Sequence, residues 1–180
     1  EEFGAPQDFR VMPLGNASMP APDAELAFAQ QSRAARLVRA VRASNGVLGE
    51  MLSRVATLRQ ATIQTPGMDP AWIARIDAVE TRLNALNVVM NGDRIVSAQQ
   101  EPTLPGINAR LGHATSNWST MGAPTATELE AYRIAGKAFE PVLAELRTIA
   151  EQDMPAIEAA LEAAGAGGTP GRLPNWKFED

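Results

Sequence analysis

The side chains that could perform chemistry in this chain are few, and their spacing favours none of the common catalytic or metal sites. His113 is the only histidine, and there is no cysteine. Di-iron bundles use two Glu-x-x-His pairs and zinc sites need several histidine or cysteine ligands, so the sequence predicts neither. Ser116 and Ser119 follow His113, but serines at this spacing on a weak helix are poor evidence for a Ser–His–acid triad. We therefore expect no catalytic residue, no metal and no cofactor in the isolated chain.

A glycine-rich segment, residues 165–171, has the glycine content of a phosphate-binding loop. It lacks the lysine of that loop, and no strand pattern precedes it. The segment is typical of a helix stop.

Arginine gathers in the first long apolar-periodic segment. Arg33, Arg36, Arg39 and Arg42 recur at every third residue, so on a helix the row winds around the axis. We favour ion pairs between this segment and the acidic last one, with an arginine patch for a phosphate or acidic partner as the alternative. No aromatic residue for base stacking lies nearby. Together with Trp176 in the tail, these four arginines are the candidate interaction residues.

Composition places the chain among acidic helical proteins of one domain. The 180 residues are 45 % apolar but only 5 % aromatic, and the net charge is −5. Small aliphatic side chains suit helix–helix packing, and the negative charge does not favour nucleic acid as a partner. No apolar run approaches the roughly 20 residues of a membrane span. Glu1-Glu2-Phe3-Gly4 suggests a mature product or a fragment.

Hydrophobic periodicity predicts an all-α fold of four helices, over residues 23–62, 69–91, 104–118 and 125–164. Caps mark three starts: Asp23, Asp69 before Pro70, and the Thr125–Glu128 capping box. Kinks are expected near Pro141 and Pro155. Mostly short connections favour an elongated up-down-up-down four-helix bundle. The first helix carries an unbroken heptad seam of Ala34, Leu37, Val41, Ser44, Leu48, Met51, Val55 and Leu58.

The two ends of the chain are rich in proline and glycine. Residues 1–22 form an expected extended arm, in which 8–12 could be one short strand. Residues 165–180 form the expected tail. Such an arm would lie along the bundle or complete a sheet of a preceding domain.

A set of turn and cap motifs resembles, in order, the C-terminal helical region of exported bacterial proteins with sialidase-like (BNR, or sortilin-like) β-propellers, often labelled glycosyl hydrolases. The matching segments are Phe9–Leu14, Pro20–Asp23, Gly92-Asp93, Glu101–Thr103, Trp118–Thr120, Ala123–Thr127, Asp153–Ala156 and Thr169–Pro174. The resemblance implies an exported, periplasmic or extracellular protein. Any hydrolytic site would lie in an upstream propeller, whose Asp-box repeats are absent here, so no catalytic residue carries over.

The function expected from these observations is that of a non-catalytic helical accessory or interaction module. Its partners would be upstream domains of the same protein or another copy of the chain. Two alternatives stay open. One is self-association, because the first helix is longer than the second and part of its seam could lack a cover. The other is a periplasmic ligand-sensing four-helix bundle with a small molecule between helices.

Overall fold

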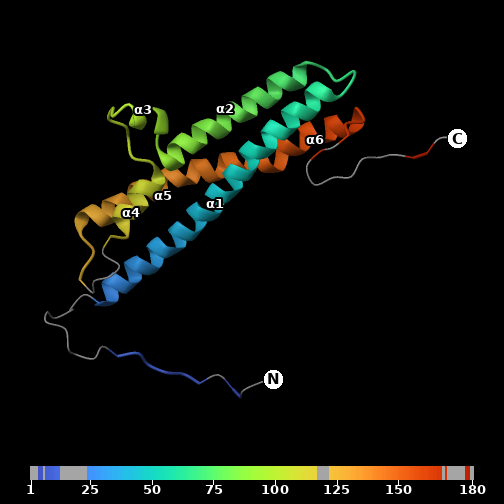
Figure 1. The fold of residues 1–180 in the computed structure, drawn as a ribbon. Helices are drawn as coiled ribbons and strands as arrows, with labels where there is room; N and C mark the ends of the chain where they lie inside the picture. Colours follow the sequence, from blue (N-terminus) through green and yellow to red (C-terminus); the bar gives the residue numbers. More distant parts are fainter. Residues whose placement is uncertain are drawn as a thin grey trace.

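The computed structural model describes residues 4, 5, 7–12, 24–116, 122–167, 169, 177 and 178. These residues are all-α, as predicted, and the part of the chain so described contains no strand. The elements, shown in Figure 1, are α1 (Ala24–Gln64), α2 (Ala71–Asn91), α3 (Arg94–Ala98), α4 (Ile107–Ala114), α5 (Ala126–Thr148), the π-helix η1 (Ile149–Asp153) and α6 (Met154–Ala163). The possible strand over residues 8–12 is not formed, and Phe9 is 87 % exposed.

The long helix α1 forms around the predicted seam. Seven of the eight seam residues are buried, and Leu37 is partly buried against the same core. Gly46 and Gly49 lie inside this continuous helix, with nothing within 4 Å of an added Cβ. The predicted cap Asp23 lies outside the described residues.

The second helix begins and ends where its sequence signals indicate. The Asp69 carboxylate accepts a hydrogen bond from the Ala71 N–H at 2.9 Å, ahead of the first turn. α2 ends at Asn91, and Gly92 follows with φ +83°, a backbone conformation that favours glycine. α2 packs antiparallel to α1 over the upper half of the bundle (Figure 1).

The predicted up-down-up-down order is not confirmed, because α4 runs in the same direction as α2. The Asn91 amide at the end of α2 hydrogen-bonds both Asn45 of α1 and Asn108 at the start of α4. Farther along α4, Thr115 lines a hollow with Val38 of α1. Both α2 and α4 therefore run antiparallel to α1. The described bundle has three runs: α1, then α2 with α4, then α5 with η1 and α6.

The third run begins at the predicted capping box and changes helix type before Pro155. Thr125 Oγ1 accepts from the Glu128 N–H, and the Glu128 carboxylate accepts from the Thr125 N–H. α5 continues through Pro141, and the π-helix η1 ends just before Met154 and Pro155. A proline ring clashes with the carbonyl four residues earlier in an α-helix, and the wider π turn relieves that clash. In the first turn of α5, the apolar side chain of Leu129 is 43 % exposed.

The lower half of α1 does not lack a cover. Ala27, Ala34 and Val41 are buried there, because α4 and α5 pack against the part of α1 that α2 does not reach. The reason first given for self-association, an uncovered seam, is therefore wrong.

Candidate functional site

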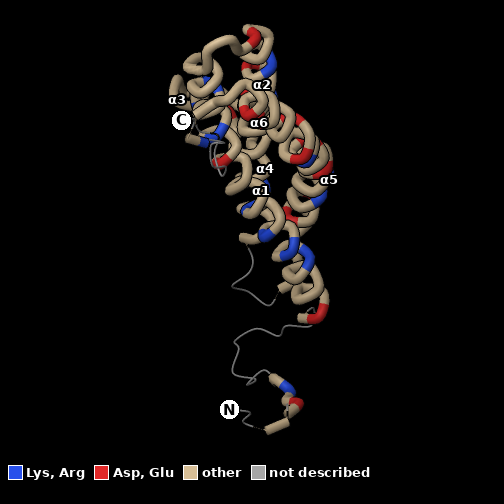
Figure 2. The backbone as a smooth tube through the Cα atoms, turned by 90° about the vertical axis from the view of Figure 1, so that its right-hand side faces the viewer, with Lys and Arg blue, Asp and Glu red and all other residues tan. Residues whose placement is uncertain are grey.

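The four predicted arginines are all exposed and follow one another along α1, with Arg42 at the rim of a hollow between α1 and α4. Arg33, Arg36, Arg39 and Arg42 are all exposed, and none of them forms an ion pair with another described residue. We call these four residues the α1 arginine face. Apart from these arginines, Ala40 is the only exposed residue between positions 33 and 42. Figure 2 shows the basic positions following one another along α1.

Ion pairs do join the helices, but they use other arginines. The Arg54 guanidinium contacts the buried Glu158 carboxylate of α6 at 2.5 Å. Arg82 of α2 bridges Glu145 of α5 at 2.5 Å and Asp153 of η1 at 2.7 Å. The favoured interpretation, in which the basic first helix pairs with the acidic last one, is thus borne out at Arg54 and not at the α1 arginine face.

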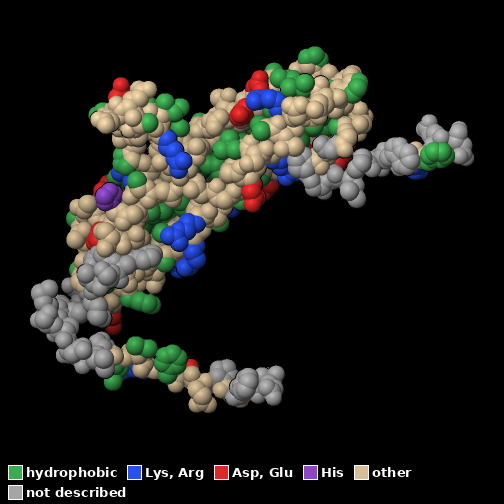
Figure 3. All heavy atoms as spheres, in the orientation of Figure 1, with side chains coloured by type: hydrophobic (Ala, Val, Ile, Leu, Met, Phe, Trp, Pro, Cys, Tyr) green, Lys and Arg blue, Asp and Glu red, His purple; other side chains and the backbone are tan. Residues whose placement is uncertain are grey.

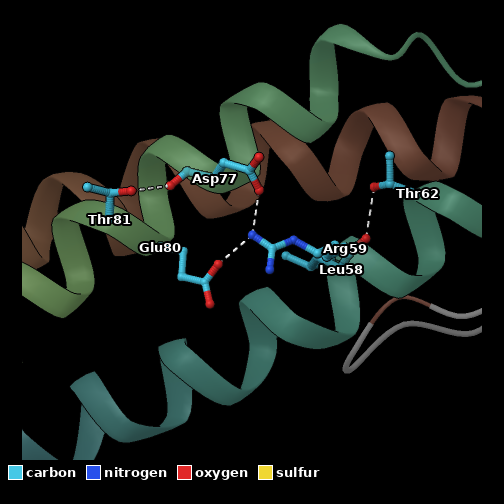
Figure 4. A network of polar contacts seen from close by, with 6 residues as sticks. All are labelled: Leu58, Arg59, Thr62, Asp77, Glu80 and Thr81. Atoms are coloured by element: carbon cyan, nitrogen blue, oxygen red, sulfur yellow. Dashed lines mark hydrogen bonds and ion pairs between the residues drawn. The ribbon is translucent and has the colours of Figure 1, made fainter.

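A second cluster of paired charges joins α1 to α2 near the turn that connects them, residues 65–70. The Arg59 guanidinium contacts both the Glu80 and the Asp77 carboxylates (Figure 4). Hydrogen bonding to Glu80, and then to Asp77, raises the pKa of Arg59 above its ordinary value. Nearby, Thr62 and Thr81 donate to the carbonyls of Leu58 and Asp77. These side chains are engaged within the bundle, which leaves the α1 arginine face as the uncompensated basic surface of this helix.

The acids of α1 lie too far along the helix to neutralise the face. Glu25 and Glu50 are each eight residues from the nearer end of the row, which is about 12 Å at 1.5 Å per residue. That separation exceeds the Debye length of about 8 Å at physiological salt, so exposed charges at this distance interact weakly. The face therefore presents local positive charge on a protein whose net charge is −5.

A hollow of about 500 Å³ between α4 and α5 is a second candidate site. We call it the α4–α5 groove. Arg110 and His113 line it from α4, and Thr127 and Glu130 line it from α5. Its apolar lining comes from Pro105, Ala126, Ala131 and Ile134. Of these two residues, only His113 stands out in the sequence, as the single histidine; Arg110 lies one turn away on the same face of α4 and no sequence motif marks it.

One hydrogen bond joins the two walls of the groove. The Ser116 hydroxyl, just after α4, lies 3.0 Å from the Glu128 carboxylate in the first turn of α5. Within α5, Arg133 forms a two-point ion pair with Glu130, and this contact lowers the pKa of Glu130 below its ordinary value. Arg133 thus compensates the Glu130 charge, while Arg110 has no ion-pair partner among the described residues.

The geometry does not bring a catalytic triad together. Ser116 Oγ lies 2.9 Å from the backbone carbonyl of His113, so the contact does not involve the imidazole. Ser119 and Trp176 lie outside the described residues, as do residues 168, 170 and 171 of the 165–171 segment. Where that segment is described, α6 ends at Ala163 and Gly165 has φ +75°, which agrees with the predicted helix stop.

The described part of the chain contains neither a cluster of metal ligands nor a helix that could span a membrane. There, no three or more histidine, aspartate or glutamate side chains gather closely enough to hold a metal ion. None of the helices found there has both the length and the hydropathy that crossing a bilayer requires.

No protein-family model, curated protein or solved structure matches the chain. The resemblance to regions that follow sialidase-like propellers therefore stays a prediction.

Proposed function

We propose that the chain is a non-catalytic helical interaction module that binds an acidic protein segment through the α1 arginine face. The observation that supports this proposal is the contrast among the arginines of α1. Arg54 and Arg59 are engaged by carboxylates within the bundle, whereas the four arginines of the face are exposed and form no ion pair with described residues.

The shape of the face indicates which partner it would suit. The row covers ten residues, or about 14 Å along the axis, and winds around α1. A partner reaching all four guanidinium groups would cross the helix obliquely, as an acidic helix or an extended acidic segment can. Exposed charges of this kind speed association and set specificity, and their effect weakens as salt rises.

A labelled peptide of twelve glutamates serves as the probe, and its affinity is measured by fluorescence anisotropy across a salt series. Replacing the four arginines of the face by glutamine should weaken binding about 10-fold or more, since four exposed charge pairs contribute a few tenths to 1 kcal/mol each. A matched control replaces four exposed cations elsewhere, at Arg94, Lys137, Arg147 and Lys177.

Both variants carry the same net charge, so the comparison separates a defined face from overall charge. We expect the control to change affinity less than about 3-fold, and each variant to keep its unfolding free energy. Equal weakening by the two variants would contradict the proposal. Substituting lysine at the four face positions tests whether charge alone suffices or the planar guanidinium is needed.

The larger context stays a proposal as well. As an accessory module of an exported propeller protein, the chain would use the arginine face to contact an upstream domain of the same protein. A binding assay between the chain and such a domain, with the two quadruple variants compared, tests this role. The ligand-sensing alternative also remains a prediction.

A further inference from the structure

A loop of thirteen residues, 93–105, projects from the bundle between α2 and α4 (Figure 1). It contains α3, which has no buried residue. Two of its large apolar side chains face solvent, since Ile95 is 76 % exposed and Leu104 is 84 % exposed. Figure 3 shows apolar atoms on this projection. The core of the described chain therefore does not account for the apolar character of these two exposed side chains.

The loop is nevertheless held in a defined shape. The Asp93 carboxylate caps α3 by accepting from the Ile95 and Val96 N–H groups at 2.9 and 3.1 Å. Ser97 and Thr103 hydrogen-bond across the loop at 3.3 Å. At its base, Gly92 and Gly106 approach so closely that a Cβ on Gly106 would lie 2.5 Å from the Gly92 nitrogen. A projection fixed in this way presents its apolar side chains at low entropic cost to a partner.

The α4–α5 groove lies directly beside the loop, because Pro105, the residue after Leu104, is part of its lining. Its volume of about 500 Å³ is ample for a leucine side chain, and Ala131 and Ile134 supply an apolar lining. The charges are complementary as well. The loop carries the exposed Glu101, and the groove carries Arg110 and His113.

We propose that two copies of the chain associate about a two-fold axis, with Leu104 of each copy inserted in the α4–α5 groove of the other. A projection and a groove that adjoin on one molecule can be satisfied reciprocally in such a dimer, and both then become covered. We assign Glu101 of each copy to a contact with Arg110 of the other, because the loop carries the acid and the groove the cation, and the two-fold axis repeats that contact. We favour a second copy over an unrelated protein because the loop of this chain carries both the apolar side chain and the acidic side chain that its own groove would bind.

Sedimentation equilibrium of the whole chain over a wide concentration range tests the dimer. Leu104→Asp should raise the dimer dissociation constant about 100-fold or more, because two buried leucine contacts are lost per dimer. The matched control is Ile63→Asp, which places the same charge at a residue that is 65 % exposed at the far end of α1. A monomer at all concentrations, or equal effects of the two substitutions, would overturn the proposal.

A charge-swap experiment tests the pairing itself. Glu101→Arg and Arg110→Glu should each weaken self-association, since like charges then meet at both contacts of a homodimer. An equimolar mixture of the two variants should dimerise again, because both contacts in the mixed dimer join opposite charges. The double variant should also recover association. Failure of both the mixture and the double variant to recover, with circular dichroism showing each variant folded, would overturn the assigned contact.

Discussion

The base of the 93–105 loop allows a sharp prediction, because Gly106 is the point where two stretches of backbone meet most closely. A Cβ at position 106 would lie 2.5 Å from the Gly92 nitrogen, 2.8 Å from the Asn91 carbonyl carbon and 2.9 Å from the Met90 oxygen. All three atoms belong to the backbone at the end of α2, so no side-chain rotation relieves the clash. Gly106→Ala must therefore push α2 and α4 apart.

The magnitude follows from the packing alone. Gly106 has φ −67° and ψ 172°, which alanine adopts readily, so the substitution adds no backbone strain. Overpacking a close contact costs about 1–3 kcal/mol, and we expect the upper part of that range because only backbone can move. Moving α2 and α4 apart would also lengthen the nearby Asn91–Asn108 hydrogen bond, which is 2.7 Å long. We expect Gly106→Ala to lower the unfolding free energy by about 2–3 kcal/mol.

Urea denaturation followed by circular dichroism measures this change, with Gly46→Ala as the matched control. Gly46 is exposed inside α1 and an added Cβ there meets nothing within 4 Å, so the same substitution should stabilise by about 0.5–1 kcal/mol. The two alanine variants should thus differ in sign. If Gly106→Ala costs less than about 0.5 kcal/mol, the close approach of the two helices is not as described.

Three further predictions concern the packing and charges of the bundle. Arg54→Ala should lower the unfolding free energy by about 2 kcal/mol in urea denaturation, because it leaves the Glu158 carboxylate, which is 3 % exposed, without that cation. Adding Glu158→Gln to Arg54→Ala removes the buried charge and should recover part of the loss. No recovery would speak against this cause. Leu58→Ala, at a fully buried seam residue, should cost about 2–5 kcal/mol by thermal and urea unfolding, whereas Ile63→Ala at the exposed end of α1 should stay within about 0.5 kcal/mol. The Glu130–Arg133 pair lowers the pKa of Glu130. The stabilisation of the fold by this pair is therefore present above the ordinary glutamate pKa of about 4.3 and is lost as pH falls through the lowered value. In an NMR titration, the Glu130 midpoint should rise in Arg133→Gln, and an unchanged midpoint would refute the pairing.

The parts of the fold that local chemistry dictates could be predicted from the sequence. The heptad seam of α1 placed Val41, Leu48 and Val55 in the core, because a sustained repeat of this period has only one face to bury. The Thr125–Glu128 capping box and the Asn91-Gly92 stop located two helix ends, since both depend on residues adjacent in sequence.

The path of α4 could not be predicted in the same way. Its direction depends on the contact of Gly106 with Gly92 and on the Asn45–Asn91–Asn108 hydrogen bonds, which join three segments far apart in the chain. The arginine pairing was misjudged for a related reason. Composition shows that one helix is basic and another acidic, but only the packing shows that Arg54 meets Glu158 while Arg39 faces solvent.

The two proposed surfaces lie on separate parts of the molecule, and this separation has a functional consequence. One side of α4 shares a hollow with Val38 and Arg42 of α1, whereas Arg110 and His113 on its other side line the groove with α5. A dimer formed through the groove would therefore leave both arginine faces accessible. Two faces on one particle bind a partner with repeated acidic segments more tightly than one face does, without any new contact. Leu104→Asp should then weaken binding to a tandem glutamate probe but leave the affinity for a single segment unchanged, whereas equal effects on both probes would show that the two surfaces are not independent.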